Sequence, residues 1–142
     1  MWLYHATFKK NLEGIMKDGL KTGMSKNYRK SSSKELYFTT DADVALDYCY
    51  NAELTSNEVW ESGTVMLAVE ANDIDDLSIV KDYDADDDTS YRYNKNIPIG
   101  KIYVVTEDDY YGDEGAYKKL KEFKCMEDVP EYINSEYEYV GA

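Results

Sequence analysis

Hydrophobic residues in the first part of the chain follow two different periods. Residues 2–7 form an aromatic-rich apolar run, which predicts a β-strand. Across residues 9–20 the apolar side chains recur at helical spacing, which predicts an amphipathic helix that Gly19 is placed to end. The buried stripe of this helix is expected to consist of Leu12, Ile15, Met16 and Leu20.

A second strand and a second helix are predicted directly after one another. Residues 36–39 form a short apolar run typical of a strand. Residues 41–52 predict a helix, for which Thr40 offers an N-cap and Asp43 an acidic side chain in the first turn.

The second half of the chain is dominated by short strands. Residues 64–71 are apolar and β-branched enough for a central strand. Pro98 has no N–H group to give to a central ladder and is expected between strands. Shorter strands are expected at 77–80, 91–93 and 101–105, acidic loops at 83–90 and 107–114, a short helix at 115–123, and a helical turn from Pro130.

The order of these elements indicates an α+β domain. Helices cluster early and strands late, which favours an antiparallel or mixed sheet with helices packed on it. The 142 residues fit a single domain, 1–142, and a composition that is 43% hydrophobic and 14% aromatic is typical of a folded core.

Cysteine usage and hydropathy favour a cytoplasmic protein. Cys49 and Cys125 lie far apart without metal-ligand spacing, so a reducing compartment is expected. Neither a signal-peptide pattern nor a run of 18 apolar residues is found, and we expect no membrane partner. The aspartates between 84 and 88 lack the glycine and distal glutamate of an EF-hand loop, so no metal is expected. Cys49 is expected to be a small buried residue.

Charge is divided unequally along the chain. Residues 1–34 carry eight Lys/Arg and two Asp/Glu, whereas residues 35–142 carry eight Lys/Arg and 27 Asp/Glu, which gives −13 overall. The acidic part of the chain should repel nucleic acid, unless this part imitates nucleic acid. The alternative is that its charge serves only to keep a small protein in solution. The basic segment 21–34 is either a site for a phosphate-bearing ligand or an ordinary solvated loop.

Candidate chemistry depends on the single histidine and two spaced tyrosines. His5 and Thr7 lie on the first expected strand, while Tyr37 and Tyr48 lie eleven positions apart on the second strand and its helix. If that helix packs back beside its strand, both rings can face one cleft. The set suggests a site for a flat polar ligand. The alternative is that each is an ordinary core residue, since the chain has 15 tyrosines.

The motifs around these residues resemble the ADP-ribosyltransferase superfamily, in the branch with a His-Tyr-Glu triad that includes poly-ADP-ribose polymerases and diphtheria-type toxins. Members often begin with Tyr-His-Gly-Thr or Tyr-His-Gly-Ser, then a helix ending in Gly-Leu, and residues 4–7 and 19–20 stand in those places. Their second motif, Gly-Ile-Tyr-Phe with a helical tyrosine eleven residues later, is matched by residues 36–38 and Tyr48. The resemblance covers 2–105, and 106–142 form a C-terminal extension.

The resemblance implies that NAD is bound as substrate by the residues of these motifs. His5 would hydrogen-bond a ribose hydroxyl, Thr7 would support it, and the backbone at Ala6 would meet the nicotinamide amide. Tyr37 and Tyr48 would sandwich the nicotinamide ring. The implied reaction is loss of nicotinamide through an oxocarbenium-like state, beside which such enzymes place a carboxylate. The implied fold is an ADP-ribosyltransferase-like set of split mixed or antiparallel sheets with N-terminal helices.

Several positions depart from the family pattern. Ala6 and Glu35 stand where glycines are usual, and a methyl group at Ala6 could crowd the ring. Ser90 stands where the catalytic glutamate would begin its strand, and Asp88 could replace that charge only if the strand begins differently. Losing one charge-stabilising group typically costs about 10²–10³ in rate.

Two functions are therefore expected, and a third is disfavoured. The first is an NAD-dependent mono-ADP-ribosyltransferase that modifies a protein or nucleic acid, as bacterial or phage toxins and effectors do. The second is a catalytically weakened binding protein on the same fold, whose acidic surface imitates nucleic acid and inhibits a basic host or defence protein. Transfer of an RNA 2′-phosphate to NAD is disfavoured because only Arg29 and Arg92 are present to hold the phosphate.

Overall fold

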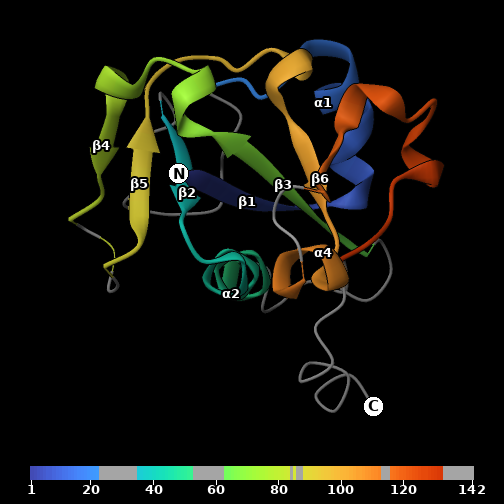
Figure 1. Ribbon diagram of the computed structural model, residues 1–142, viewed down its shortest axis with the longest axis horizontal. Coiled ribbons are helices and arrows are strands. Elements are labelled where there is room, and N and C mark those ends of the chain that lie inside the picture. The colour runs from blue at the N-terminus through green and yellow to red at the C-terminus, as the bar shows by residue number, and fades with distance from the viewer. Residues whose placement is uncertain (23–34, 53–62, 84, 86–87, 113–115, 133–142) are drawn as a thin grey trace.

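The fold is seen in a computed structural model, which describes residues 1–22, 35–52, 63–83, 85, 88–112 and 116–132 (Figure 1). Most of the basic segment 21–34 and the aspartates at 84, 86 and 87 lie outside these residues, as does the chain after Tyr132. The expectations for these segments stay predictions.

One antiparallel sheet organises the molecule. Its strands are β1 Trp2–Phe8, β2 Leu36–Thr39, β3 Thr64–Glu70, β4 Ile79–Lys81, β5 Ser90–Tyr93, β6 Tyr103–Val105 and β7 Lys118–Lys119. Their order across the sheet is β4-β5-β2-β1-β3-β6-β7, and every pairing between them is antiparallel. Together with the helices, this sheet confirms the α+β class.

Helices cover both faces of the sheet. They are α1 Leu12–Asp18, α2 Ala42–Ala52 and α4 Glu107–Tyr111, with short 3₁₀ turns at Lys9–Asn11, Ala71–Asp73, Asp76–Ser78, Ile99–Lys101, Leu120–Glu122 and Met126–Asp128. In Figure 1, α2 and α4 lie together at one side of the sheet and α1 lies at the other.

The central strand β3 explains why two cores form. Val65, Leu67 and Val69 belong to the cluster that includes Leu12 of α1, whereas Met66 and Ala68 belong to the cluster that includes the buried face of α2. Alternate residues of a strand point to opposite faces, and helices cover both faces here. β3 is therefore an almost continuous apolar run rather than an alternating one.

A seam between β1 and β2 divides the sheet. β1 pairs with β3 along its whole length, from Trp2 with Glu70 to Phe8 with Thr64. On its other side, the register described between β1 and β2 is the single pair Tyr4 and Thr39. The half β4-β5-β2 therefore meets the half β1-β3-β6-β7 along a seam with a short described register, and this seam carries His5 and Tyr37.

Two helix boundaries are set by specific residues. Gly19 ends α1 with φ of 78°, and a Cβ atom there would lie 2.2 Å from the Ile97 carbonyl oxygen. Asp41, not Thr40, caps α2, because its Oδ1 accepts hydrogen bonds from the backbone N–H groups of Asp43 (2.9 Å) and Val44 (3.4 Å). The prediction of Thr40 as N-cap was therefore wrong by one residue.

The C-terminal third differs most from the sequence-based expectation. The acidic segment predicted as a loop at 107–114 contains α4, which begins at a Thr106 cap and holds three acidic residues in its first turn. The helix predicted at 115–123 is instead β7 followed by the 3₁₀ turn Leu120–Glu122. Residues 130–132 are not helical, and the continuation of the turn expected at Pro130 lies outside the described residues.

Within the described part of the chain, no helix is long and apolar enough to cross a membrane.

Candidate functional site

His5 lies at the seam between the two halves of the sheet. Its Nδ1 is 2.9 Å from the backbone carbonyl oxygen of Tyr37, and its ring centroid is 5.7 Å from that of Phe38. His5 follows Tyr4, the residue of β1 that is in register with Thr39 of β2. The side chain of His5 thus joins the two half-sheets.

The protonation of His5 follows from these surroundings. A carbonyl oxygen only accepts hydrogen bonds, so Nδ1 must carry the proton that it donates to Tyr37. Burial lowers the pKa of His5 below its ordinary value of 6.5, because a charged imidazolium is poorly solvated there. At neutral pH the ring is therefore uncharged, and Nε2 carries a lone pair that can accept a hydrogen bond from a ligand.

The neighbours of His5 on β1 have different partners. The hydroxyl of Thr7 accepts a hydrogen bond from Asn11 Nδ2 at 3.3 Å, and Thr7 is buried. Ala6 pairs with Met66 and packs against the core cluster beneath α2. The described contacts of Thr7 thus lead towards the start of α1 and not to His5, so its supporting role stays a prediction.

Tyr37 faces a charged neighbour on the next strand. It is half-buried and pairs with Arg92 of β5. Arg92 Nη1 donates a hydrogen bond to Glu35 Oε1 at 3.3 Å, while Arg92 Nε is buried and has no hydrogen-bond partner among the described residues. A paired carboxylate and guanidinium therefore lie next to Tyr37.

Sequence reasoning gave no site role to this ion pair. Glu35 was noted only as a departure from the usual glycine, and Arg92 only as one of two arginines. The available signal was β2–β5 pairing, because antiparallel register places residues of the two strands directly opposite one another.

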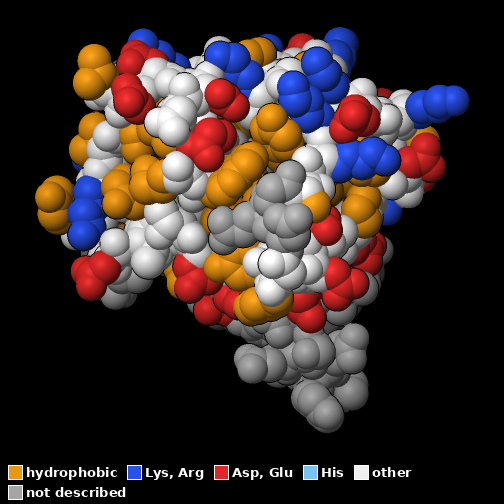
Figure 2. Space-filling model, viewed as in Figure 1, with side chains coloured by type: hydrophobic (Ala, Val, Ile, Leu, Met, Phe, Trp, Pro, Cys, Tyr) orange, Lys and Arg blue, Asp and Glu red, His pale blue; other side chains and the backbone are white. Residues whose placement is uncertain are grey.

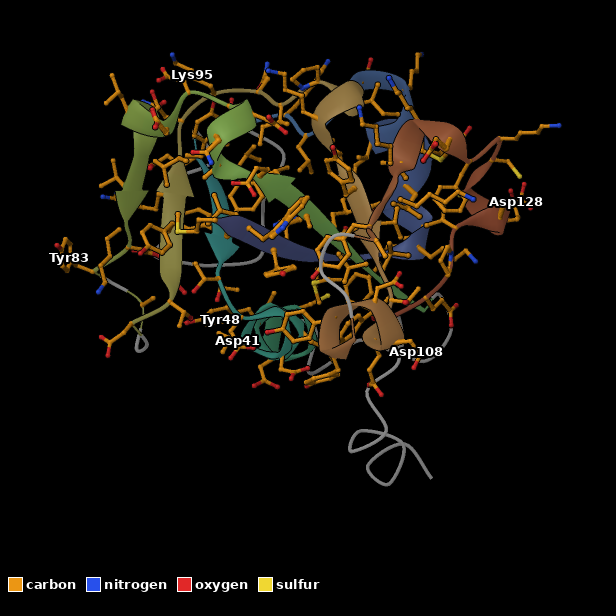
Figure 3. All side chains as sticks on the ribbon, in the orientation of Figure 1. Asp41, Tyr48, Tyr83, Lys95, Asp108 and Asp128 are labelled. Carbon is orange, nitrogen blue, oxygen red and sulfur yellow. The ribbon has the colours of Figure 1, made fainter. Side chains whose placement is uncertain are left out.

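Tyr48 lies on the flank of α2. It is half-buried, whereas Ala45 and Cys49 on the buried face of the helix are in the core. Figure 3 shows Tyr48 on the side of α2 nearer to β5. α2 packs closely on β1 and more lightly on β2, so the helix does return beside its strand. That the Tyr37 and Tyr48 rings enclose one slot with His5 stays a prediction.

The expected position of a catalytic carboxylate holds a buried hydroxyl. Ser90 is the first residue of β5, pairs with Thr39, and accepts the Asp82 N–H at its backbone oxygen at 2.9 Å. Asp88 is exposed in the preceding loop. The hydroxyls of Thr39 and Thr89 share a hydrogen bond of 2.8 Å beside this strand start. A threonine- and serine-lined region therefore stands where the resemblance implies a glutamate.

The arrangement suits binding of a neutral polar group more than charge stabilisation. Nε2 of His5 can accept from a hydroxyl, and the carboxylate of Glu35 is already bonded to Arg92. The described residues contain no cluster of three or more His, Cys, Asp or Glu that could hold a metal ion. Cys49 is buried, as expected. Comparison with models of known protein families gives no match, and comparison with curated protein sequences gives none either.

Proposed function

We propose that the chain binds NAD at the β1–β2 seam and transfers its ADP-ribosyl group to a protein or nucleic-acid acceptor. The observation that carries this proposal is the state of His5. Its Nδ1–H is bonded to the Tyr37 carbonyl and its pKa is lowered, which leaves Nε2 as a neutral acceptor at the seam. A ribose hydroxyl is the group that such an acceptor would bind.

The proposed reaction is a substitution at the nicotinamide-bearing ribose carbon. The C–N bond to nicotinamide breaks and its electron pair leaves with the neutral base. The acceptor nucleophile then forms a bond to the same carbon and loses its proton. Tyr37 and Tyr48 would hold the nicotinamide ring by stacking, and His5 would fix the ribose.

The residues near Ser90 predict a slow reaction. An oxocarbenium-like state needs nearby negative charge, and Ser90 offers a neutral hydroxyl. Asp88 is exposed, and the Glu35 carboxylate is neutralised by Arg92. We therefore expect a rate about 10²–10³ below that of an enzyme with the complete triad.

Binding and transfer are tested separately with purified protein. NAD should raise the melting temperature in a concentration-dependent way, since a ligand that binds only the folded state stabilises it. His5→Ala and Tyr48→Ala should abolish this shift, while Tyr83→Ala, at an exposed tyrosine, should retain it. Labelled ADP-ribose from NAD should appear on a component of a cell lysate. An unchanged melting temperature at millimolar NAD, together with no labelled product, would refute the proposal.

A second function, inhibition of a basic protein without catalysis, is favoured by the buried Ser90 and the net charge of −13. It predicts a salt-sensitive complex that persists in His5→Ala. Affinity capture at low and high salt with wild-type protein and His5→Ala distinguishes this function from NAD-dependent transfer.

A further inference from the structure

The outer edge of β4 is a second surface with unusual chemistry. β4 is the last strand on its side of the sheet, and its described strand pairing is with β5 on the inner side alone. Figure 1 shows β4 at one margin of the molecule, away from α1, α2 and α4. An edge strand presents backbone N–H and C=O groups that can pair with another chain.

Large apolar side chains are exposed along this edge. Leu77 is 91% exposed, Tyr83 is 83% exposed and Val80 is 46% exposed. Among the described residues only Met1 and Tyr111 are also large, apolar and exposed. Figure 3 places Tyr83 beyond the end of β4, pointing away from the sheet, and Figure 2 shows hydrophobic side chains gathered over this margin. The exposed apolar side chains thus concentrate within seven residues around one free strand.

The charged residues near this edge favour a basic partner over a second copy of the chain. Asp76, just before β4, and Asp88, between β4 and β5 in the chain, are both exposed. A second copy of this chain would bring the same carboxylates to the interface, and like charges placed opposite each other are destabilising. A basic partner would instead be attracted to this edge. The Tyr83 ring already lies 6.0 Å from the Lys81 ammonium group, so it can accept a cation at its face.

We propose that the β4 edge binds an extended, basic segment of a partner protein by strand addition. Backbone hydrogen bonds to β4 would provide the pairing, and Leu77, Val80 and Tyr83 would contact apolar side chains of the segment. Asp76 and Asp88 would attract its Lys and Arg residues. This surface includes no residue of the proposed NAD site. Binding of a partner to β4 therefore does not depend on ADP-ribosyl transfer.

The test uses three synthetic peptides of equal length and the full chain. One alternates Arg with Val, the second alternates Glu with Val, and the third is the Arg–Val peptide with prolines that prevent strand pairing. The Arg–Val peptide should bind, while the other two should bind at least about tenfold more weakly. The double variant Leu77→Ser/Tyr83→Ser should lose affinity by about tenfold, and Lys121→Ser, near the opposite edge strand β7, should not.

Three results would overturn the proposal. They are absence of binding at low salt, equal binding of the proline-containing peptide, or unchanged affinity of the Leu77→Ser/Tyr83→Ser variant. The last two would mean that the overall negative charge alone attracts basic peptides. Because both substituted side chains are exposed, the double variant should keep the wild-type melting temperature, which verifies that it is folded.

Discussion

At the scale of single residues, several side chains connect distant segments of the chain through hydrogen bonds that are mostly buried or half-buried. At the seam, His5 donates to Tyr37 and remains neutral. Beneath the sheet, the Asp43 carboxylate accepts the phenol hydroxyls of Tyr132 (3.1 Å) and Tyr111, and Asp41 accepts that of Tyr110 at 3.4 Å. The tyrosines of the C-terminal third thus anchor the first turn of α2.

The lowered pKa of His5 predicts a specific acid sensitivity. The unfolded chain takes up a proton at this residue near pH 6.5, whereas the folded chain resists it, so folding stability should fall as pH decreases below about 6.5. His5→Gln removes this titration. Urea unfolding of both proteins between pH 8 and pH 5 should show a smaller loss for the variant. Equal losses would contradict the neutral state of His5 at the seam.

The phenol–carboxylate contacts predict alkaline sensitivity. Burial, together with the neighbouring aspartates, raises the pKa of Tyr110 to about 12 and also raises the pKa of Tyr132. The hydrogen bond to Asp43 is the main cause of the raised pKa of Tyr111. A raised pKa stabilises the fold below pH 10 and loses that contribution as pH rises through the folded-state value. Stability should therefore decline from pH 10 towards pH 12. Tyr132→Phe should cost about 1–2 kcal/mol at pH 7 and make the alkaline decline shallower, as unfolding measured by circular dichroism would show.

At the scale of elements, two glycines of the first helix have opposite roles. Gly19 ends α1 with a positive φ and lies against the Ile97 carbonyl, where Leu20 and Ile97 form an isolated bridge. Gly14 lies inside α1, and an added Cβ would meet no atom within 4 Å. Substitution of alanine at each of these two glycines of α1 therefore provides a matched comparison of their roles.

Gly19→Ala should destabilise the protein by more than about 1 kcal/mol, because alanine would be strained at that φ and would clash with the carbonyl. Gly14→Ala should stabilise it by about 0.5–1 kcal/mol through helix propensity. Chemical denaturation of both variants measures the difference. A destabilising Gly14→Ala, or a neutral Gly19→Ala, would contradict this description of α1.

Thr106 provides a test of the element that the sequence pattern did not predict. Its side chain accepts a hydrogen bond from the Asp109 N–H at 3.1 Å at the start of α4. Thr106→Ala should cost about 1 kcal/mol, and Thr106→Ser should cost less. Equal stability of the three proteins in thermal unfolding would show that the cap contributes nothing.

At the scale of the molecule, the spacing of hydrophobic residues along the chain predicted the helices and strands that bury an apolar face. β1, α1, β2, α2 and β3 were all expected from their patterns, and they form the centre of the fold. β7 has two residues and exists because it pairs with β6, so local sequence carries little signal for it. α4 was mistaken for a loop because its charges were weighed above its threonine cap.

The candidate site was predictable only in part. The sequence pattern placed His5 on the first expected strand and Tyr37 on the second, and the structure shows these strands side by side with His5 bonded to the Tyr37 backbone carbonyl. The pairing between β1 and β2 and the Arg92–Glu35 pair depend on contacts between distant segments, which no single stretch of sequence specifies.

Because His5 is the only histidine, ¹⁵N labelling of histidine gives a direct measurement of the proposed NAD site. Free protein at pH 7.5 should show a neutral ring protonated at Nδ1. Addition of NAD should shift the unprotonated Nε2 resonance in a saturable manner as it accepts a ribose hydroxyl, and the Nδ1 proton should remain. A ring protonated at Nε2, or an Nε2 resonance unaffected by millimolar NAD, would contradict the assignment of this seam as an NAD site.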